Sequence, residues 1–108
     1  MMTAIDRHPR HDLDALLTHG VRLSVVAALS QVDRAEFGLV RDLIQTTAPV
    51  LSKQVATLEA AHYVEVSKGK VGRQARTWLH LTRAGRGAYD RHLQALQSIA
   101  ALSPQVDH

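Results

Sequence analysis

The amino-acid sequence predicts a mainly helical α+β fold, in which short helices precede a two-stranded β-hairpin and a long final helix. Up to residue 62, apolar residues recur at the three- and four-residue spacing of helices. From Tyr63 to Leu81 apolar and polar residues alternate instead, as in half-buried strands, and helical spacing returns after Thr82. A chain of 108 residues suffices for one such domain, which we expect at residues 11–103, between a flexible N-terminus (1–10) and a tail (104–108).

The composition excludes several classes of protein. Hydrophobic residues make up 45% of the chain and charged residues 21%, a balance typical of globular rather than disordered proteins. Cysteine is absent, which excludes disulfides, thiolate zinc sites and cysteine nucleophiles. The longest apolar runs, such as Val25 to Leu29, are far shorter than a bilayer span, and no signal peptide opens the chain. We therefore expect a soluble, cytoplasmic protein with no membrane partner.

Two helices are expected before residue 33. The first begins near His11 and ends at Gly20, with an apolar stripe formed by Leu13, Leu16 and Leu17. The second is expected over Val21–Val32, with Val25, Val26 and Leu29 on one face. Arg22 falls on that same stripe, so we expect it to be a partly buried, paired arginine.

A third and a fourth helix follow a polar break at Asp33–Glu36. The third is expected over Phe37–Gln45, from the spacing of Phe37, Val40 and Ile44. Thr47 is a suitable N-cap for the fourth helix, and Pro49 is tolerated in its first turn, where no backbone N–H is needed. This helix is expected to continue to about Ala61 and to bury Leu51, Val55 and Leu58.

The alternating segment predicts a hairpin, and the segment after it a long helix. Strands are expected at Tyr63–Lys68 and Ala75–Leu81, joined by a long, flexible, basic tip at Gly69–Gln74. Thr82 is a suitable N-cap for a helix that continues to about Leu102, where Pro104 stops it. A helix of this length spans roughly 30 Å, more than the preceding body can cover, so its apolar face is expected to contact a partner.

The positive charge is concentrated in the hairpin and the start of the last helix. The whole chain carries a net charge of +3, whereas residues 66–91 carry seven basic residues and one acid, a local charge of +6. A local basic segment on a nearly neutral small protein favours contact with a polyanion, because each neutralised phosphate releases counterions. The alternative is a face that serves only solubility.

Three short helices, a hairpin and a C-terminal helix in this order predict a winged helix-turn-helix. In that architecture the second helix of the helix-turn-helix enters the major groove, and the hairpin, or wing, contacts the DNA backbone or the minor groove. Short or flexible polar side chains on the fourth helix suit contacts with base edges and phosphates, and basic side chains on the wing suit phosphates. The residues expected to contact DNA are Thr47, Pro49, Val50, Ser52, Lys53, Gln54 and Thr57 on the helix, and Lys68, Lys70, Arg73, Gln74 and Arg76 on the wing.

Three segments carry a resemblance to a known family. RLSVVAAL (22–29), LSKQVATLEAAHYVEVSKG (51–69) and VGRQARTWLHLTRAGRGAYDRHL (71–93) resemble the MarR/ArsR-like winged-helix transcriptional regulators, in particular the short single-domain group of bacteria and archaea. The resemblance covers about 70% of the chain. It implies a homodimer that binds an inverted-repeat operator in double-stranded DNA, usually as a repressor. Relatives often carry histidine at the position of Gln54, and a glutamine there is able to pair with adenine.

The terminal segments are expected to form the dimer. The apolar residues predicted to pack across the two-fold axis are Leu13, Leu16, Leu17, Tyr89, Leu93, Leu96 and Ile99. The same interface is where an unidentified small-molecule or metal effector would bind, if the protein is a gated sensor.

Other functions find less support in the sequence. Asp90 and His92 have the D-x-H spacing of the interhelical metal site in some ArsR-type sensors, but no complementary pair follows in that helix, so we expect no bound metal and no cofactor. No catalytic signature is present, and an enzyme is not expected. A winged helix used as a protein-interaction module stays open as an alternative and predicts no salt-dependent binding to duplex DNA.

Overall fold

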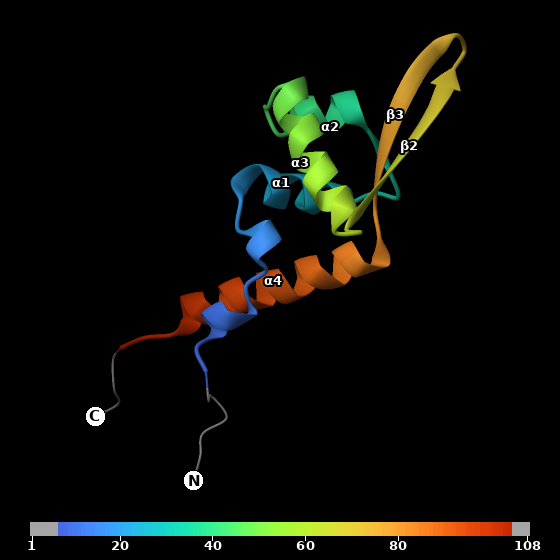
Figure 1. The fold of residues 1–108 in the computed structure, drawn as a ribbon. Helices are drawn as coiled ribbons and strands as arrows, with labels where there is room; N and C mark the ends of the chain where they lie inside the picture. The colour runs from blue at the N-terminus through green and yellow to red at the C-terminus, as the bar shows by residue number, and fades with distance from the viewer. Residues whose placement is uncertain (1–6, 105–108) are drawn as a thin grey trace.

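The computed structural model describes residues 7–104 and has the predicted order of helices, hairpin and long final helix (Figure 1). The mainly helical α+β prediction is confirmed. The elements are two 3₁₀ turns, η1 (Pro9–Asp12) and η2 (Ala15–Leu17), then α1 (Gly20–Leu29), β1 (Ala35–Glu36), α2 (Phe37–Leu43), α3 (Ala48–Ala60), β2 (Val64–Val71), β3 (Gln74–Leu81) and α4 (Arg83–Ala101).

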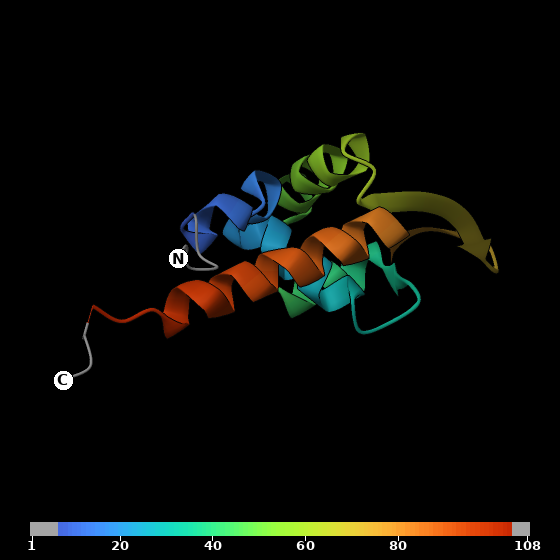
Figure 2. The ribbon, with the colours of Figure 1, turned by 90° about the horizontal axis from the view of Figure 1, so that it is seen from below.

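The core lies where α1, α3, α4 and the inner half of the hairpin meet. Its fully buried side chains are aliphatic, with Val25, Val26 and Leu29 from α1, Leu51 and Leu58 from α3, and Leu79 from β3. The apolar stripes predicted for α1 and α3 are therefore the buried ones. Seen from below, α4 crosses the length of the body, with η1 and η2 beside its C-terminal half and the hairpin projecting from the opposite end (Figure 2).

The sheet has three strands rather than the two that were predicted. Its strand order is β1-β3-β2, and β1 pairs antiparallel with β3 through Ala35 opposite Leu79 and Glu36 opposite Trp78. The prediction of a polar break at these positions was wrong because two residues are too few for an alternating pattern to show in the sequence. β1 places the start of α2 directly beside the hairpin.

The wing is a regular ladder almost to its end, so the prediction of a long flexible tip was wrong. β2 continues to Val71 and β3 begins at Gln74, and these two residues pair. Gly69 and Lys70 pair within the ladder as well, because backbone hydrogen bonds do not require β-forming side chains. Gly72 has φ +63°, which a two-residue hairpin turn needs at its first central position and which glycine adopts without steric cost.

The N-terminal segment forms two 3₁₀ turns in place of the predicted helix. The side chains of His8 and Asp14 each accept a backbone N–H two residues ahead and so begin separate short turns. The backbone N–H of Asp14 donates to Nδ1 of His92 on α4 (2.9 Å), and its carboxylate accepts the Tyr63 hydroxyl proton (2.6 Å). Asp14 thus connects the segment to both α4 and the hairpin. Residues 1–6 of the predicted flexible N-terminus lie outside the described residues.

The hydrogen bond from Tyr63 to Asp14 raises the pKa of Tyr63 to about 12, and burial of the phenol contributes to the rise. The folded state therefore favours the neutral phenol. This contribution to stability is complete below the unfolded-state pKa of about 10 and is lost as the pH rises through about 12.

We expect Asp14→Asn to lower the pKa of Tyr63 towards its unfolded value, because an amide does not stabilise the phenol as a carboxylate does. Asparagine keeps an acceptor for the backbone N–H of Leu16, so the 3₁₀ turn is retained. A spectrophotometric titration of phenolate measures the change, with Tyr63→Phe to assign the signal. An unchanged titration in Asp14→Asn would contradict the assigned contact.

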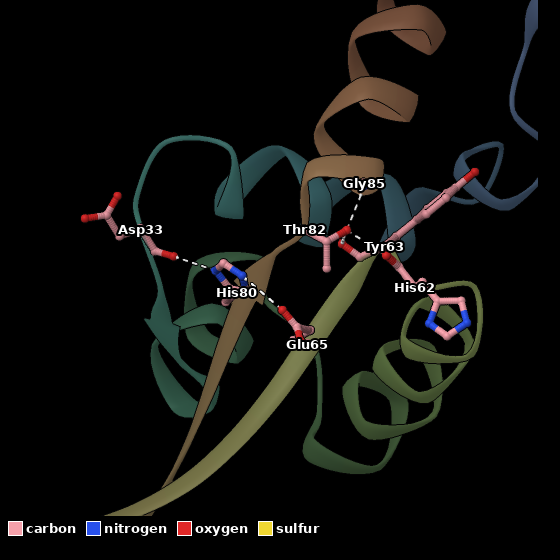
Figure 3. A network of polar contacts seen from close by, with 7 residues as sticks. All are labelled: Asp33, His62, Tyr63, Glu65, His80, Thr82 and Gly85. Atoms are coloured by element: carbon pink, nitrogen blue, oxygen red, sulfur yellow. Dashed lines mark hydrogen bonds and ion pairs between the residues drawn. The ribbon is translucent and has the colours of Figure 1, made fainter.

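The hairpin and α4 meet at a junction formed by Tyr63, Thr82 and Gly85 (Figure 3). The backbone N–H of Thr82 donates to the carbonyl of Tyr63 (3.0 Å), and the Thr82 hydroxyl donates to the carbonyl of His62 (2.6 Å). The same hydroxyl accepts the N–H of Gly85 (2.9 Å), as predicted for an N-cap. A Cβ on Gly85 would overlap the Tyr63 carbonyl oxygen and lie 2.7 Å from Leu81 Cδ1, so the close approach of α4 requires glycine here.

We expect Gly85→Ala to destabilise the fold by about 1–3 kcal/mol, because the added methyl group meets backbone atoms that cannot rotate away. Gly87→Ala is the matched control on the same helix. A Cβ there lies 3.2 Å from the flexible end of Arg91, so this change is expected to be neutral or stabilising by up to about 1 kcal/mol. Urea unfolding of both variants measures the difference, and equal stabilities would show that the junction tolerates a side chain.

Candidate nucleic-acid interface

Helices α2 and α3 form the helix-turn-helix, and α3 exposes one face along its first two turns. The Thr47 side chain accepts the N–H of Val50 (3.4 Å), which confirms the predicted N-cap, and Pro49 lies in the first turn. Leu51, Val55 and Leu58 are buried, as predicted. The exposed residues at this end of the helix are Thr47, Ala48, Pro49, Val50, Ser52, Lys53 and Ala56.

Gln54 is not on this exposed face, and its predicted role in pairing with adenine is corrected. Its side chain is only 9% exposed, and its Oε1 accepts a hydrogen bond from Arg22 Nη1 (2.7 Å). Arg22 also donates from Nε to the carbonyl of Leu16 (2.6 Å), so the prediction of a partly buried, paired arginine is confirmed. The sequence did contain the signal, because Gln54 lies three residues after Leu51 and four before Leu58, on the buried stripe.

Thr57, the last predicted contact on α3, is partly buried. Its hydroxyl donates to the carbonyl of Lys53 one turn earlier (3.2 Å). Ser52 and Lys53 remain as the exposed polar side chains between Thr47 and this turn.

One face of the wing continues the surface of α3. Lys68 and Lys70 occupy the same strand face as the core residues Val64 and Val66, but further out, where both are exposed. Between α3 and the hairpin lies an open groove of about 520 Å³, lined by Ser52, Ala56 and Glu59 from the helix and by Lys68 and Thr77 from the strands, among others. Two of the residues predicted to contact DNA, Ser52 and Lys68, are thus brought together.

The opposite face of the wing is occupied by contacts within the chain. His80 lies between a Glu65 carboxylate oxygen (3.2 Å) and the carbonyl of Asp33 (3.3 Å) (Figure 3). The Arg34 guanidinium stacks over the ring of Trp78, 4.1 Å from its centre. These contacts attach the connection after α1 to the base of the hairpin.

The predicted wing residues therefore differ in their surroundings. Arg76 lies on the occupied face, with Nε 3.4 Å from Glu36 Oε2, so its charge is partly neutralised within the chain. This ion pair could not be predicted from the sequence, because β1, which carries Glu36, was not predicted. Lys68, Lys70, Arg73 and Gln74 are exposed along the wing and at its turn.

The residues predicted for the dimer fall into two groups. Leu17 is fully buried in the core, so it is not available to a partner and that part of the prediction is corrected. The physical reason is that the 3₁₀ turn directs Leu17 inwards beneath α1. Tyr89 is half-buried and packs against the core. The others lie outside the core cluster, with Leu96 38% exposed and Leu13, Leu16, Leu93 and Ile99 half-buried.

The two residues of the candidate metal pair, Asp90 and His92, lie on different faces of α4. His92 is buried and its Nδ1 accepts the N–H of Asp14, whereas Asp90 is exposed. Within residues 7–104, no three His, Asp or Glu side chains are grouped in a way that would hold a metal ion. None of the helices in this range has the length and hydropathy needed to cross a bilayer.

Comparison with known protein families shows which family has this fold. A model of the winged helix DNA-binding domain matches residues 21–100. The chain belongs to this family. The matched residues run from the start of α1 to the last turn of α4, so the winged-helix domain includes the helix-turn-helix, the wing and most of the final helix. The predicted winged helix-turn-helix is confirmed.

Solved structures share the fold of this winged-helix domain at low sequence identity. A transcriptional regulator homologue from Pyrococcus horikoshii OT3 is 22% identical, with a TM-score of 0.77 over 84% of this chain and 91% of its own. A MarR-family transcriptional regulator from Silicibacter pomeroyi is 24% identical, with a TM-score of 0.65 over 90% and 68%. The M. tuberculosis transcriptional regulator MOSR, solved in complex with DNA, is 20% identical, with a TM-score of 0.66 over 89% and 65%. A search of curated protein sequences finds no match.

Proposed function

We propose that the winged-helix domain is a sequence-specific regulator of transcription that binds an inverted-repeat operator as a homodimer and acts as a repressor. The observation that carries the proposal is the shared groove between α3 and the wing, into which exposed residues of both predicted DNA-contacting sets converge. Base contacts would come from the first two turns of α3, and phosphate contacts from the wing.

The charges at the two elements suit this role. The first turn of α3 contains no acidic residue, so no carboxylate opposes a phosphate there. Lys53 on the helix and Lys68, Lys70 and Arg73 on the wing are exposed and are available to neutralise phosphates. Arg76 would contact a phosphate only if DNA displaced Glu36 from its ion pair with Arg76.

The dimer is proposed from apolar surface that the single chain leaves uncovered. Leu96 is exposed on α4, and Leu13, Leu16, Leu93 and Ile99 are half-buried without joining the core. α4 has 19 residues, about 28 Å, and its C-terminal half is flanked within the described residues by the N-terminal turns (Figure 2). A two-fold axis along these residues would place two α3 helices in successive major grooves, roughly 34 Å apart.

The charge contacts are tested by Lys53→Ala and Arg73→Ala. Each is expected to weaken binding to a selected operator and to reduce the steepness of log K against log salt by about 2, because each removes one phosphate contact from each protomer of the proposed dimer. Arg10→Ala removes an exposed arginine next to α4, far along the chain from the DNA-facing elements, and serves as the control. Fluorescence anisotropy at several salt concentrations provides the measurement. Duplex binding that does not depend on salt, or no binding, would favour a protein-interaction module instead.

The dimer is tested by Leu96→Glu, which is expected to convert the protein to a monomer because two carboxylates would meet near the axis. Leu39→Glu is the matched control, since Leu39 on α2 is 66% exposed and lies outside the proposed interface. Sedimentation equilibrium gives the mass of each variant. If Leu96→Glu stays dimeric, the interface lies elsewhere, and if the wild type is monomeric, the homodimer itself is wrong.

A further inference from the structure

We infer that α3 recognises thymine through its methyl group, with Val50 as the principal contact. This inference rests on the proposed binding of duplex DNA. It concerns the chemistry of base recognition, which the family and the fold leave undetermined.

Helix α3 presents few polar side chains on its exposed face. Gln54 is bonded to Arg22 in the interior, and the Thr57 hydroxyl is bonded to its own helix. Between the N-cap and residue 56, the exposed residues are then Ala48, Pro49, Val50, Ser52, Lys53 and Ala56. Four of these six are apolar and have no side-chain donor or acceptor, so most of this surface cannot distinguish bases by hydrogen bonding.

Val50 occupies a helix position that usually carries a different type of residue. With Thr47 as N-cap, Val50 is the N3 residue, where a glutamate or glutamine would complete a capping box and an acid would interact favourably with the helix dipole. The chain instead has a β-branched apolar residue that is 41% exposed. Local preference is broken at a surface position, which is typical of a residue selected for an intermolecular contact.

The major groove offers an apolar group that an aliphatic side chain can contact. The N-terminal residues of a recognition helix contact base edges. The C5-methyl group of thymine is the apolar feature that direct readout in this groove uses, and aliphatic side chains contact it. Val50 has two methyl groups and no polar atom beyond the backbone, so thymine is the base that it is able to select.

The test removes the methyl group from the DNA and the apolar surface from the protein in turn. An operator is first selected from a pool of duplex fragments with the wild-type protein. Each thymine of one half-site is then replaced singly by deoxyuridine, which lacks only the C5-methyl group. We expect a loss of about four-fold in affinity at one or two positions, the effect of leaving one methyl-sized group unburied.

Val50→Ser replaces both methyl groups of the side chain by a single hydroxyl, and we expect it to lose most of this sensitivity to deoxyuridine. Val32→Ser is the matched control, because Val32 is 44% exposed and lies after α1, outside the helix-turn-helix. Thermal melting establishes that both variants are folded. The control is expected to keep the wild-type sensitivity at the same positions.

The remaining outcomes separate this inference from the proposed function. Salt-dependent binding without sensitivity to deoxyuridine at any position overturns thymine recognition and leaves the regulator intact. Sensitivity that persists unchanged in Val50→Ser overturns the assignment to Val50. A protein that binds no duplex in the selection overturns both the inference and the DNA-binding function.

Discussion

The relation between the wing and α4 depends on the carbonyl group of Tyr63. This oxygen accepts the N–H of Thr82 at the start of α4, and Gly85 lets the helix backbone approach it closely. β2 begins one residue after Tyr63, and α4 begins one residue after Thr82. A single backbone group therefore fixes both where the hairpin leaves the body and where the long helix starts. The Tyr63 hydroxyl extends the same connection to Asp14 and the N-terminal turns.

A second connection passes through Arg22. Its guanidinium group contacts the carbonyl of Leu16 and the side chain of Gln54, and so links the N-terminal turns to α3 across α1. A partly buried arginine requires acceptors, since an unpaired charge is costly away from water. Gln54, the polar residue on the inner face of α3, thus helps to hold the DNA-contacting helix in place. Several residues on the outer face of α3 are apolar.

The helical part of the fold could be predicted because its signal is periodic and extends over several turns. The expected bounds of the fourth and the last helix differ from those of α3 and α4 by one residue at their C-terminal ends. The elements that the sequence did not predict depend on short or distant contacts. β1 has two residues, and the N-terminal turns are set by Asp14 through its contacts with Tyr63 and His92, far along the chain.

The candidate site was predictable to a similar degree. Residue type and position were sufficient to place Pro49, Ser52 and Lys53 on the outer face of the helix. Gln54 was misplaced because its polarity was given more weight than its helical spacing. Arg76 required knowledge of Glu36, which becomes its neighbour only when β1 joins the sheet.

The regular ladder of the wing makes it a mechanical lever. β2 has eight residues, so the turn at Gly72 and Arg73 is held roughly 26 Å from the base, at about 3.3 Å per residue. A tilt of about 5° at the base would move the tip by roughly 2 Å, enough to break or form a hydrogen bond. Because α4 starts at that base, small changes in how the two α4 helices of the proposed dimer pack against each other would be amplified at the tip of the wing.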